Sequence, residues 1–155
     1  MIWKLRYQQA HQKHFQNAYP TAWKDGFYSN PTIPNAKTAN GLTKIVNNFL
    51  NWEEHRSTRI NVSGRLIDGT EKQPSGVTLH VKKWMPSTTR RGTADISATI
   101  NGKAVMLEIK VGKDKPSEFQ IAEQIRERKA GGIYEFISSP EQFFILYDQI
   151  TKIDK

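Results

Sequence analysis

Two carboxylates and an amine lie close together in the most strongly patterned segment of the chain. Two runs of alternating residues flank Asn101-Gly102, which is the strongest short-range signal for a two-residue hairpin turn. In that hairpin Asp95 lies directly opposite Glu108, with Cα atoms about 4.5 Å apart and side chains on the same face. Lys110 follows Glu108 by two residues and shares this face. Such a group could bind a divalent cation, with the amine as a compact positive charge beside it.

The alternation of residue types supports this register independently. With Ile100 paired to Lys103, one face of the hairpin is entirely apolar and carries Ile96, Ala98, Ile100, Val105, Leu107 and Ile109. The other face is nearly all polar and carries Asp95, Ser97, Thr99, Met106, Glu108 and Lys110. Because side chains alternate with a period of two, a slip of one residue would exchange the two faces. We therefore expect the apolar face to pack on a core and the polar face to meet water.

The two opposed acids need a neutralising partner. At about 5 Å and an effective dielectric constant of about 20, their repulsion is roughly 3 kcal/mol. A purely structural hairpin does not normally place like charges opposite each other. A shared proton, the neighbouring Lys110 or a divalent cation would each remove the repulsion. The alternative to a metal site is a Lys110 salt bridge on a solvated sheet face.

The elements around the hairpin are predicted from apolar periodicity and turn residues. In chain order they are a helix over 38–52, a strand over 59–63, an extended segment over 77–81, a helix over 117–130, a strand over 133–137 and a final helix. That last helix begins with Ser139 as N-cap, Pro140 at the first position and Gln142 at the third, which predicts a capping box. The order predicts an α/β fold with a mixed central sheet flanked by helices.

The first 36 residues differ from the rest of the chain. Their aromatic residues are spread between polar ones, and Pro31 and Pro34 break any regular element. A short helix around residues 4–16 is compatible with this pattern, and we expect the aromatics to pack on the main domain rather than to stack on bases. We therefore divide the chain into an N-terminal extension, 1–36, and a main domain, 37–155.

Composition limits the class of protein. The chain has 155 residues, with 23 Lys and Arg against 15 Asp and Glu, a formal net charge of +8. Residues 37–92 carry ten basic and four acidic side chains, whereas residues 93–155 carry nine basic and ten acidic ones. A basic surface beside an acidic cluster suggests a polyanion held against a metal site, although charge can also serve solubility alone. Without cysteine there are no disulfides, thiol nucleophiles or Cys-containing metal sites. No apolar run approaches a membrane span, so we expect a cytoplasmic protein.

Several motifs together resemble a known nuclease family. They are Gly92-Thr93-Ala94-Asp95-Ile96, Glu108-Ile109-Lys110, Ser117-x-x-Gln120 and Gly131-Gly132. In this pattern the chain, over about residues 38–148, resembles the VRR-NUC (virus-type replication-repair nuclease) branch of the PD-(D/E)XK superfamily. The resemblance implies a restriction-endonuclease-like core of αβββαβ order. It also implies hydrolysis of phosphodiester bonds in DNA with Mg²⁺ or Mn²⁺ as cofactor.

The resemblance also implies roles for individual residues. Asp95 and Glu108 would ligate the metal with help from the Ile109 carbonyl, and Lys110 would orient or deprotonate the attacking water. Gln120 would line the site, although Ser117 and Gln120 also form a capping-box pattern in which the glutamine reaches back to the Ser117 amide.

One departure from the superfamily concerns the helix over 38–52. Many members carry an acidic residue there, but this helix offers Asn40, Lys44, Asn47 and Asn48. Its only carboxylates, Glu53-Glu54, come at its end and are interpreted as a solvated helix end. Asn47 or Asn40 would then contact substrate or water near the metal.

Basic and amide side chains around the motifs are candidates for DNA binding. They are Arg90, Arg91, Lys113, Lys115, Gln124, Lys44 and Asn47. Such residues contact phosphates without reading sequence, and the chain lacks a helix-turn-helix or zinc-finger signature. Together with these residues, the resemblance implies a metal-dependent endonuclease that acts on branched or flap DNA in replication, repair or recombination. Small nucleases of this type often work as homodimers. One alternative is a non-catalytic DNA-binding module that keeps the nuclease fold. Another is an interaction protein whose basic face meets an acidic partner and in which Lys110 pairs with Glu108 structurally.

Overall fold

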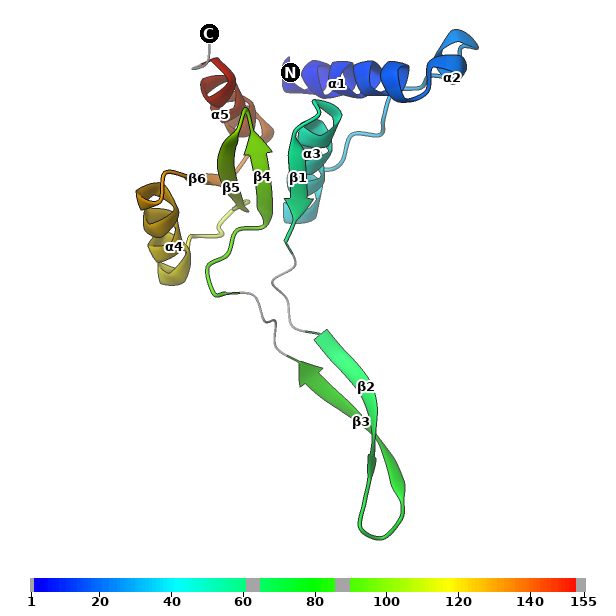
Figure 1. Cartoon of the computed structure of the whole chain (residues 1–155), viewed down its shortest axis with the longest axis vertical. Coiled ribbons are helices and arrows are strands. Elements are labelled where there is room, and N and C mark those ends of the chain that lie inside the picture. Colours follow the sequence, from blue (N-terminus) through cyan, green and yellow to red (C-terminus); the bar gives the residue numbers. More distant parts are fainter. Residues whose placement is uncertain (1, 61–64, 86–89, 153–155) are drawn as a thin grey trace.

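The protein has a mixed α/β fold built on a four-stranded mixed sheet. The computed structural model describes residues 2–60, 65–85 and 90–152. Its elements in chain order are α1 (Ile2–Ala18), α2 (Pro20–Lys24), α3 (Ala39–Trp52), β1 (Arg56–Arg59), β2 (Arg65–Lys72), β3 (Thr78–Met85), β4 (Ile96–Ile100), β5 (Lys103–Ile109), α4 (Glu118–Lys129), β6 (Ile133–Ile137) and α5 (Pro140–Lys152). The main sheet has the order β1-β4-β5-β6, with β6 parallel to β5 and the other pairs antiparallel. Helices flank this sheet (Figure 1).

The β4–β5 hairpin has the predicted register. Ile96 pairs with Leu107 and Ile100 pairs with Lys103. Asn101 and Gly102 have φ values of 47° and 75°, as a type I′ turn requires of its two central residues. All six residues of the predicted apolar face are buried. The prediction of the hairpin, of its turn and of its apolar face is confirmed. The expectation that the polar face meets water is wrong at Glu108, which is 4% exposed because Gln120 of α4 packs against it.

The apolar face of the hairpin packs against helices from both ends of the chain. α3 begins after the N-cap Thr38 and buries all five of its predicted apolar residues, Leu42, Ile45, Val46, Phe49 and Leu50. These residues share one core with residues of β4, β5, α5 and α1. Burying such a face removes apolar surface from water at about 25 cal/mol per Å². The core therefore lies on one side of the sheet, and the polar face of the hairpin lies on the other side.

The N-terminal helix is part of this core. α1 spans residues 2–18 and is thus longer than the predicted segment. Its Trp3 and Tyr7 are buried, and the Tyr7 ring lies 4.8 Å from that of Trp52. The Arg6 guanidinium donates two hydrogen bonds, of 2.7 and 3.1 Å, to the Asp148 carboxylate on α5. These contacts join the two ends of the described chain.

Two strand predictions differ in their bounds from the structure. The first strand is Arg56–Arg59 rather than 59–63, and residues 61–64 lie outside the described part of the chain. Apolar alternation misplaced this strand because only Ser57 faces the core, where its hydroxyl donates to Asn47 Oδ1 at 2.8 Å. The extended segment 77–81 overlaps β3, which pairs with β2 in a separate two-stranded sheet. This β2–β3 ribbon extends away from the four-stranded sheet (Figure 1).

The last helix has a modified cap. Pro140 begins α5 and the Ser139 hydroxyl accepts from the Gln142 amide at 3.3 Å, as predicted. The Gln142 side chain, however, accepts from the Ser138 amide at 2.8 Å, so the predicted reciprocal bond is displaced by one residue. Within the described residues, none of the helices has both the length and the apolar character needed to cross a membrane.

Candidate active site

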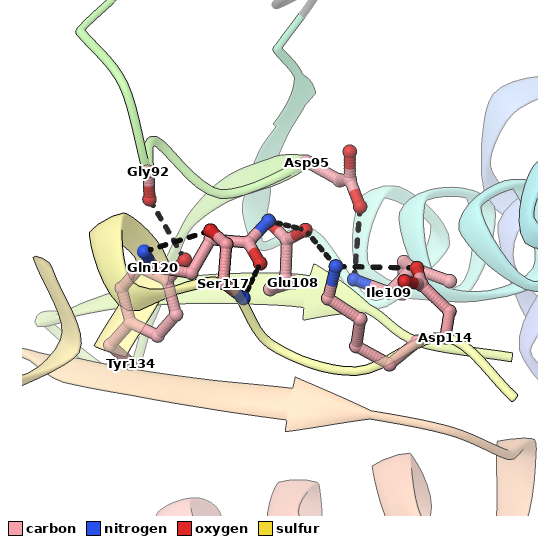
Figure 2. A network of polar contacts seen from close by, with 9 residues as sticks. Gly92, Asp95, Glu108, Ile109, Asp114, Ser117, Gln120 and Tyr134 are labelled. Atoms are coloured by element: carbon pink, nitrogen blue, oxygen red, sulfur yellow. Dashed lines mark hydrogen bonds and ion pairs between the residues drawn. The ribbon is translucent and has the colours of Figure 1, made fainter. Parts of the chain in front are cut away.

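The polar end of the β4–β5 hairpin brings Asp95 and Glu108 to the same place. Asp95 immediately precedes β4, and Glu108 and Ile109 end β5. The Asp95 carboxylate accepts a 2.9 Å hydrogen bond from the Ile109 amide through Oδ2 (Figure 2). This bond ties the side chain of Asp95 to the neighbouring strand beside Glu108.

Glu108 is a buried carboxylate with one satisfied oxygen and one unsatisfied oxygen. The residue is 4% exposed. Its Oε1 accepts from Gln120 Nε2 at 2.5 Å and lies 3.2 Å from Lys110 Nζ. Its Oε2 is buried and has no hydrogen-bond partner within the described residues. Burial raises the pKa of Glu108 to about 7, the negative charge of Asp95 adds to the rise, and Lys110 opposes it.

Lys110 holds its amine between two acids. Its Nζ lies 3.2 Å from Glu108 Oε1 and 3.2 Å from Asp114 Oδ2, and only 12% of its side chain is exposed. Asp114 is a member of the site that the sequence analysis missed. Its only signal was a position four residues after Lys110, in a segment with no regular periodicity. The two contacts fix the amine beside the Glu108 carboxylate, whose Oε2 has no hydrogen-bond partner within the described residues.

Gln120 serves both roles that the sequence left open. Its Oε1 accepts from the Ser117 amide at 2.9 Å, and the Ser117 hydroxyl accepts from the Gln120 amide at 3.3 Å, which completes a capping box at the start of α4. The same side chain donates through Nε2 to Glu108 (Figure 2). The cap therefore fixes the orientation of the amide group that contacts the buried acid.

A second group of residues joins β6 and α4 to the segment that carries Asp95. Burial raises the pKa of Tyr134, so its hydroxyl stays protonated and donates to the Gly92 carbonyl at 2.9 Å. Gly92 has φ +84°, and a Cβ atom there would lie 2.3 Å from the Phe119 carbonyl oxygen. In the sequence Gly92 stood out only as a motif residue, and no pattern marked Tyr134 or Phe119 as part of the site. They position the turn before Asp95 against the first turn of α4.

Gln124, a predicted DNA-binding residue, makes a contact between α4 and β6. Its Nε2 donates to the Tyr134 carbonyl at 2.9 Å, because α4 packs along β6. Gln124 thus holds the helix to the strand.

Of the predicted DNA-binding residues, four remain around the site. Arg90 and Arg91 precede Gly92; Arg90 lies 3.7 Å from Glu123, and the Arg91 guanidinium lies 5.4 Å from the centre of the Phe119 ring. Lys113 and Lys115 are exposed in the segment that joins β5 to α4. All four stand close in sequence to the residues that form the site.

Two of the predicted DNA-binding residues, Lys44 and Asn47, lie on α3. Asn47 accepts from the buried Ser57 hydroxyl, which belongs to the core side of β1. Lys44 is exposed on the same helix. α3 packs on the apolar face of the hairpin, and within the described residues neither Lys44 nor Asn47 has a hydrogen bond or ion pair with Asp95 or Glu108. Glu53, at the end of α3, pairs with Lys13 at 3.7 Å and adds no carboxylate to the site.

A divalent cation fits the donors that the site offers. The unpartnered Glu108 Oε2 and the Asp95 carboxylate are hard oxygen donors, and Mg²⁺ is commonly bound by one or two carboxylates, with water and substrate completing its shell. In the described residues there is no group of three or more His, Cys, Asp or Glu that could hold a metal ion. In a site with two carboxylates, water and substrate oxygens therefore complete the coordination.

No family model, curated protein or solved structure matches the chain in comparisons with known proteins. The assignment of a function therefore depends on the residues and geometry of the site itself.

The raised pKa of Glu108 predicts a pH-dependent stability in the metal-free protein. Its pKa in the folded protein, about 7, lies above the usual value of 4.5. The protonated carboxyl group therefore makes its full contribution to the free energy of unfolding below pH 4.5, and this contribution is lost as the pH rises to about 7. The shift corresponds to about 3 kcal/mol. We expect Glu108→Gln to be more stable than wild type by up to this amount at pH 8 and about equal at pH 4.5. Urea unfolding in EDTA at both pH values measures the difference in free energy of unfolding between the two proteins. The same difference at pH 8 and at pH 4.5 would contradict a raised pKa of Glu108.

Proposed function

We propose that this protein is a metal-dependent DNA endonuclease that hydrolyses phosphodiester bonds and prefers branched or flap DNA. The observation that carries the proposal is the state of Glu108, a buried carboxylate with an unpartnered oxygen next to Asp95 and to the fixed amine of Lys110. An ion pair with a purely structural role usually satisfies both carboxylate oxygens, because an unsatisfied buried acceptor costs about 1–3 kcal/mol. A cation bound to this oxygen would offset the cost.

The order of the elements supports the proposal. α3, β1, β4, β5, α4 and β6 follow one another in the αβββαβ order of a restriction-endonuclease-like core, with the β2–β3 ribbon inserted between β1 and β4. In that order the proposed metal ligands fall at the start of one central strand and the end of its neighbour. The sheet topology and the residue pattern thus both support a restriction-endonuclease-like nuclease.

The chain's own groups suit hydrolysis of a phosphodiester. A bound Mg²⁺ or Mn²⁺ would supply a Lewis acid that polarises the scissile phosphate and acidifies water. Lys110 provides a positive charge that is already in position where negative charge develops in the transition state. Gln120 holds the Glu108 carboxylate through Oε1 and leaves Oε2 for the metal. Asp95 keeps its orientation through the Ile109 amide.

The distribution of charge supports DNA as the substrate. Between Lys72 and Ala94 the sequence contains no Asp or Glu. The basic residues of this stretch are Lys72, Lys82, Lys83, Arg90 and Arg91. In the sequence these residues lie in the β2–β3 ribbon and in the segment just before Asp95. Positive charge is therefore concentrated in the part of the sequence that leads to the site. Such side chains attract phosphates and release counterions on binding.

A cleavage assay tests the function. Purified wild-type protein is incubated with fork, flap, four-way junction and linear duplex DNA in Mg²⁺, in Mn²⁺ and in EDTA. We expect cleavage of the branched substrates in either metal and none in EDTA. Binding without cleavage in both metals would favour the non-catalytic DNA-binding module. If no substrate were bound, the interaction protein would be favoured, since the Lys110–Glu108 ion pair is the contact that it requires.

The two roles of Gln120 can be separated by substitution. Glu is as good as Gln at the third position of a capping box, so Gln120→Glu preserves the cap but places a second carboxylate against Glu108. We expect this variant to keep the capping contacts of α4 and to lose at least about tenfold in cleavage, about 1.4 kcal/mol of barrier. Ser117→Ala should have the opposite profile, with a stability loss of about 1 kcal/mol and near-normal activity well below its melting temperature. Thermal melts and initial rates measure both; equal loss of activity in the two variants would contradict a direct role for Gln120.

A homodimer would allow two cuts on a two-fold symmetric junction, and we include it in the proposal. Sedimentation equilibrium of the free protein and of its junction complex measures the stoichiometry.

A further inference from the structure

A hollow of about 160 Å³ lies between β1 and β4. Its lining consists of Arg56, Thr58, Ile60, Ser97, Ala98 and Thr99. None of these residues belongs to the site described above.

Strand register places the hollow beside the candidate active site. On β4, Ser97 and Thr99 follow Asp95 by two and four residues, so they lie on the same face, about 6.6 and 13 Å along the strand. Thr58 pairs with Ser97, and Arg56 pairs with Thr99. The Ile60 amide donates to the Asp95 carbonyl at 2.7 Å, which joins the end of β1 to the start of the site. The hollow is therefore the continuation of the polar face beyond Asp95.

The polar groups of the hollow lack protein partners. Within the described residues, the side chains of Arg56, Thr58, Ser97 and Thr99 have no hydrogen bond or ion pair. Arg59, three residues after Arg56 on the same strand, instead donates to Asn40 Oδ1 at 2.8 Å. The lining thus offers a guanidinium with five N–H donors and three hydroxyl groups, and it contains no carboxylate. This set of groups suits an anion with several oxygen atoms.

We propose that the hollow binds a backbone phosphate of the DNA strand adjacent to the scissile phosphate. The inference rests on the proposed nuclease function, because a strand whose scissile phosphate reaches Asp95 and Glu108 carries a further phosphate at each neighbouring nucleotide. Arg56 supplies the positive charge, and Thr58 and Ser97 supply neutral donors, as is common in contacts that position DNA without reading its sequence. The hollow therefore sets which phosphate enters the site.

Binding measured without metal tests the phosphate site separately from catalysis. Fluorescence anisotropy in EDTA gives the Kd of a labelled DNA fork over a range of salt concentrations for wild type, Arg56→Gln and the double variant Thr58→Val/Ser97→Ala. Arg59→Gln is the matched control, since it removes the same charge from the same strand on the other face of the sheet. Thermal melts confirm that each variant is folded.

Arg56→Gln is expected to weaken binding several-fold and to lower the slope of log Kobs against log salt by about 0.9, the value for one lost phosphate contact. The double variant should weaken binding without a change of slope, because hydroxyl groups displace no counterions. In Mg²⁺, Arg56→Gln should raise KM and leave kcat within about twofold of wild type. Equal changes of slope in Arg56→Gln and Arg59→Gln would overturn the proposal, because they would show only an effect of general charge.

The outcomes distinguish the two proposals. Cleavage with an unchanged Arg56→Gln slope would overturn the phosphate site and leave the nuclease assignment standing. The expected loss of slope in a protein that does not cleave would support the site and overturn the assignment of catalysis. No binding of DNA by wild type would overturn both.

Discussion

Replacing Glu108 by glutamine is expected to reduce metal-dependent DNA cleavage by at least about 10³-fold, equivalent to about 4 kcal/mol of barrier. The amide group is nearly the same size as the carboxylate and can still accept from Gln120, so the local packing is preserved. It lacks the negative charge that a divalent cation requires at the unpartnered oxygen. The loss should therefore fall on catalysis and metal binding, whereas the fold remains intact.

Glu118→Gln is the matched control for this experiment. Glu118 is exposed in the first turn of α4, two residues before Gln120, and its substitution removes one negative charge from the same region. Initial rates with saturating Mg²⁺ are compared for both variants and wild type, and the Mg²⁺-dependent rise in melting temperature reports metal binding. Substantial cleavage by Glu108→Gln, or equal losses of cleavage rate in the two variants, would show that Glu108 has no part in catalysis.

Replacing Gly92 by alanine is expected to destabilise the protein and to reduce DNA cleavage. The residue has φ +84°, which alone costs an L-amino acid about 1–2 kcal/mol. The added Cβ would also lie 2.3 Å from the carbonyl oxygen and 2.7 Å from the carbonyl carbon of Phe119. Since both are backbone atoms, the turn before Asp95 or the first turn of α4 must move. We expect a stability loss larger than the conformational cost and a loss of at least about tenfold in kcat, about 1.4 kcal/mol, because Gln120 shifts with α4.

Gly131→Ala separates the two causes. Gly131 has φ +90° at the other end of α4, and an added Cβ would meet nothing within 4 Å. This control therefore includes only the conformational cost. Urea unfolding and cleavage rates are measured for both variants. If Gly92→Ala were no more destabilising than Gly131→Ala and retained full activity, the close approach of the two backbone segments would be irrelevant to the site.

Much of the sheet could be predicted because its signals are local. Asn101-Gly102 has the residues that a type I′ turn prefers, and the alternation on both sides of it allows only one register. The helix at 39–52 likewise follows from its apolar period and from its N-cap Thr38. Where that local signal was misleading, at β1, a polar residue faced the core and took a partner from a helix. Buried polar pairs of this kind leave no periodic pattern.

The pairing of Asp95 with Glu108 and the position of Lys110 followed from residue type and spacing alone, because a strand has a fixed repeat and a two-residue turn sets its register. The contacts that make this group a candidate active site depend on segments that are distant in the chain. Tyr134 reaches Gly92 across 42 positions, and Gln120 reaches Glu108 from a helix on the far side of a loop. Among the residues that the structure describes, packing leaves one Glu108 oxygen buried without a hydrogen-bond partner. Its burial and its raised pKa depend on the three-dimensional environment, which no pattern along the chain specifies.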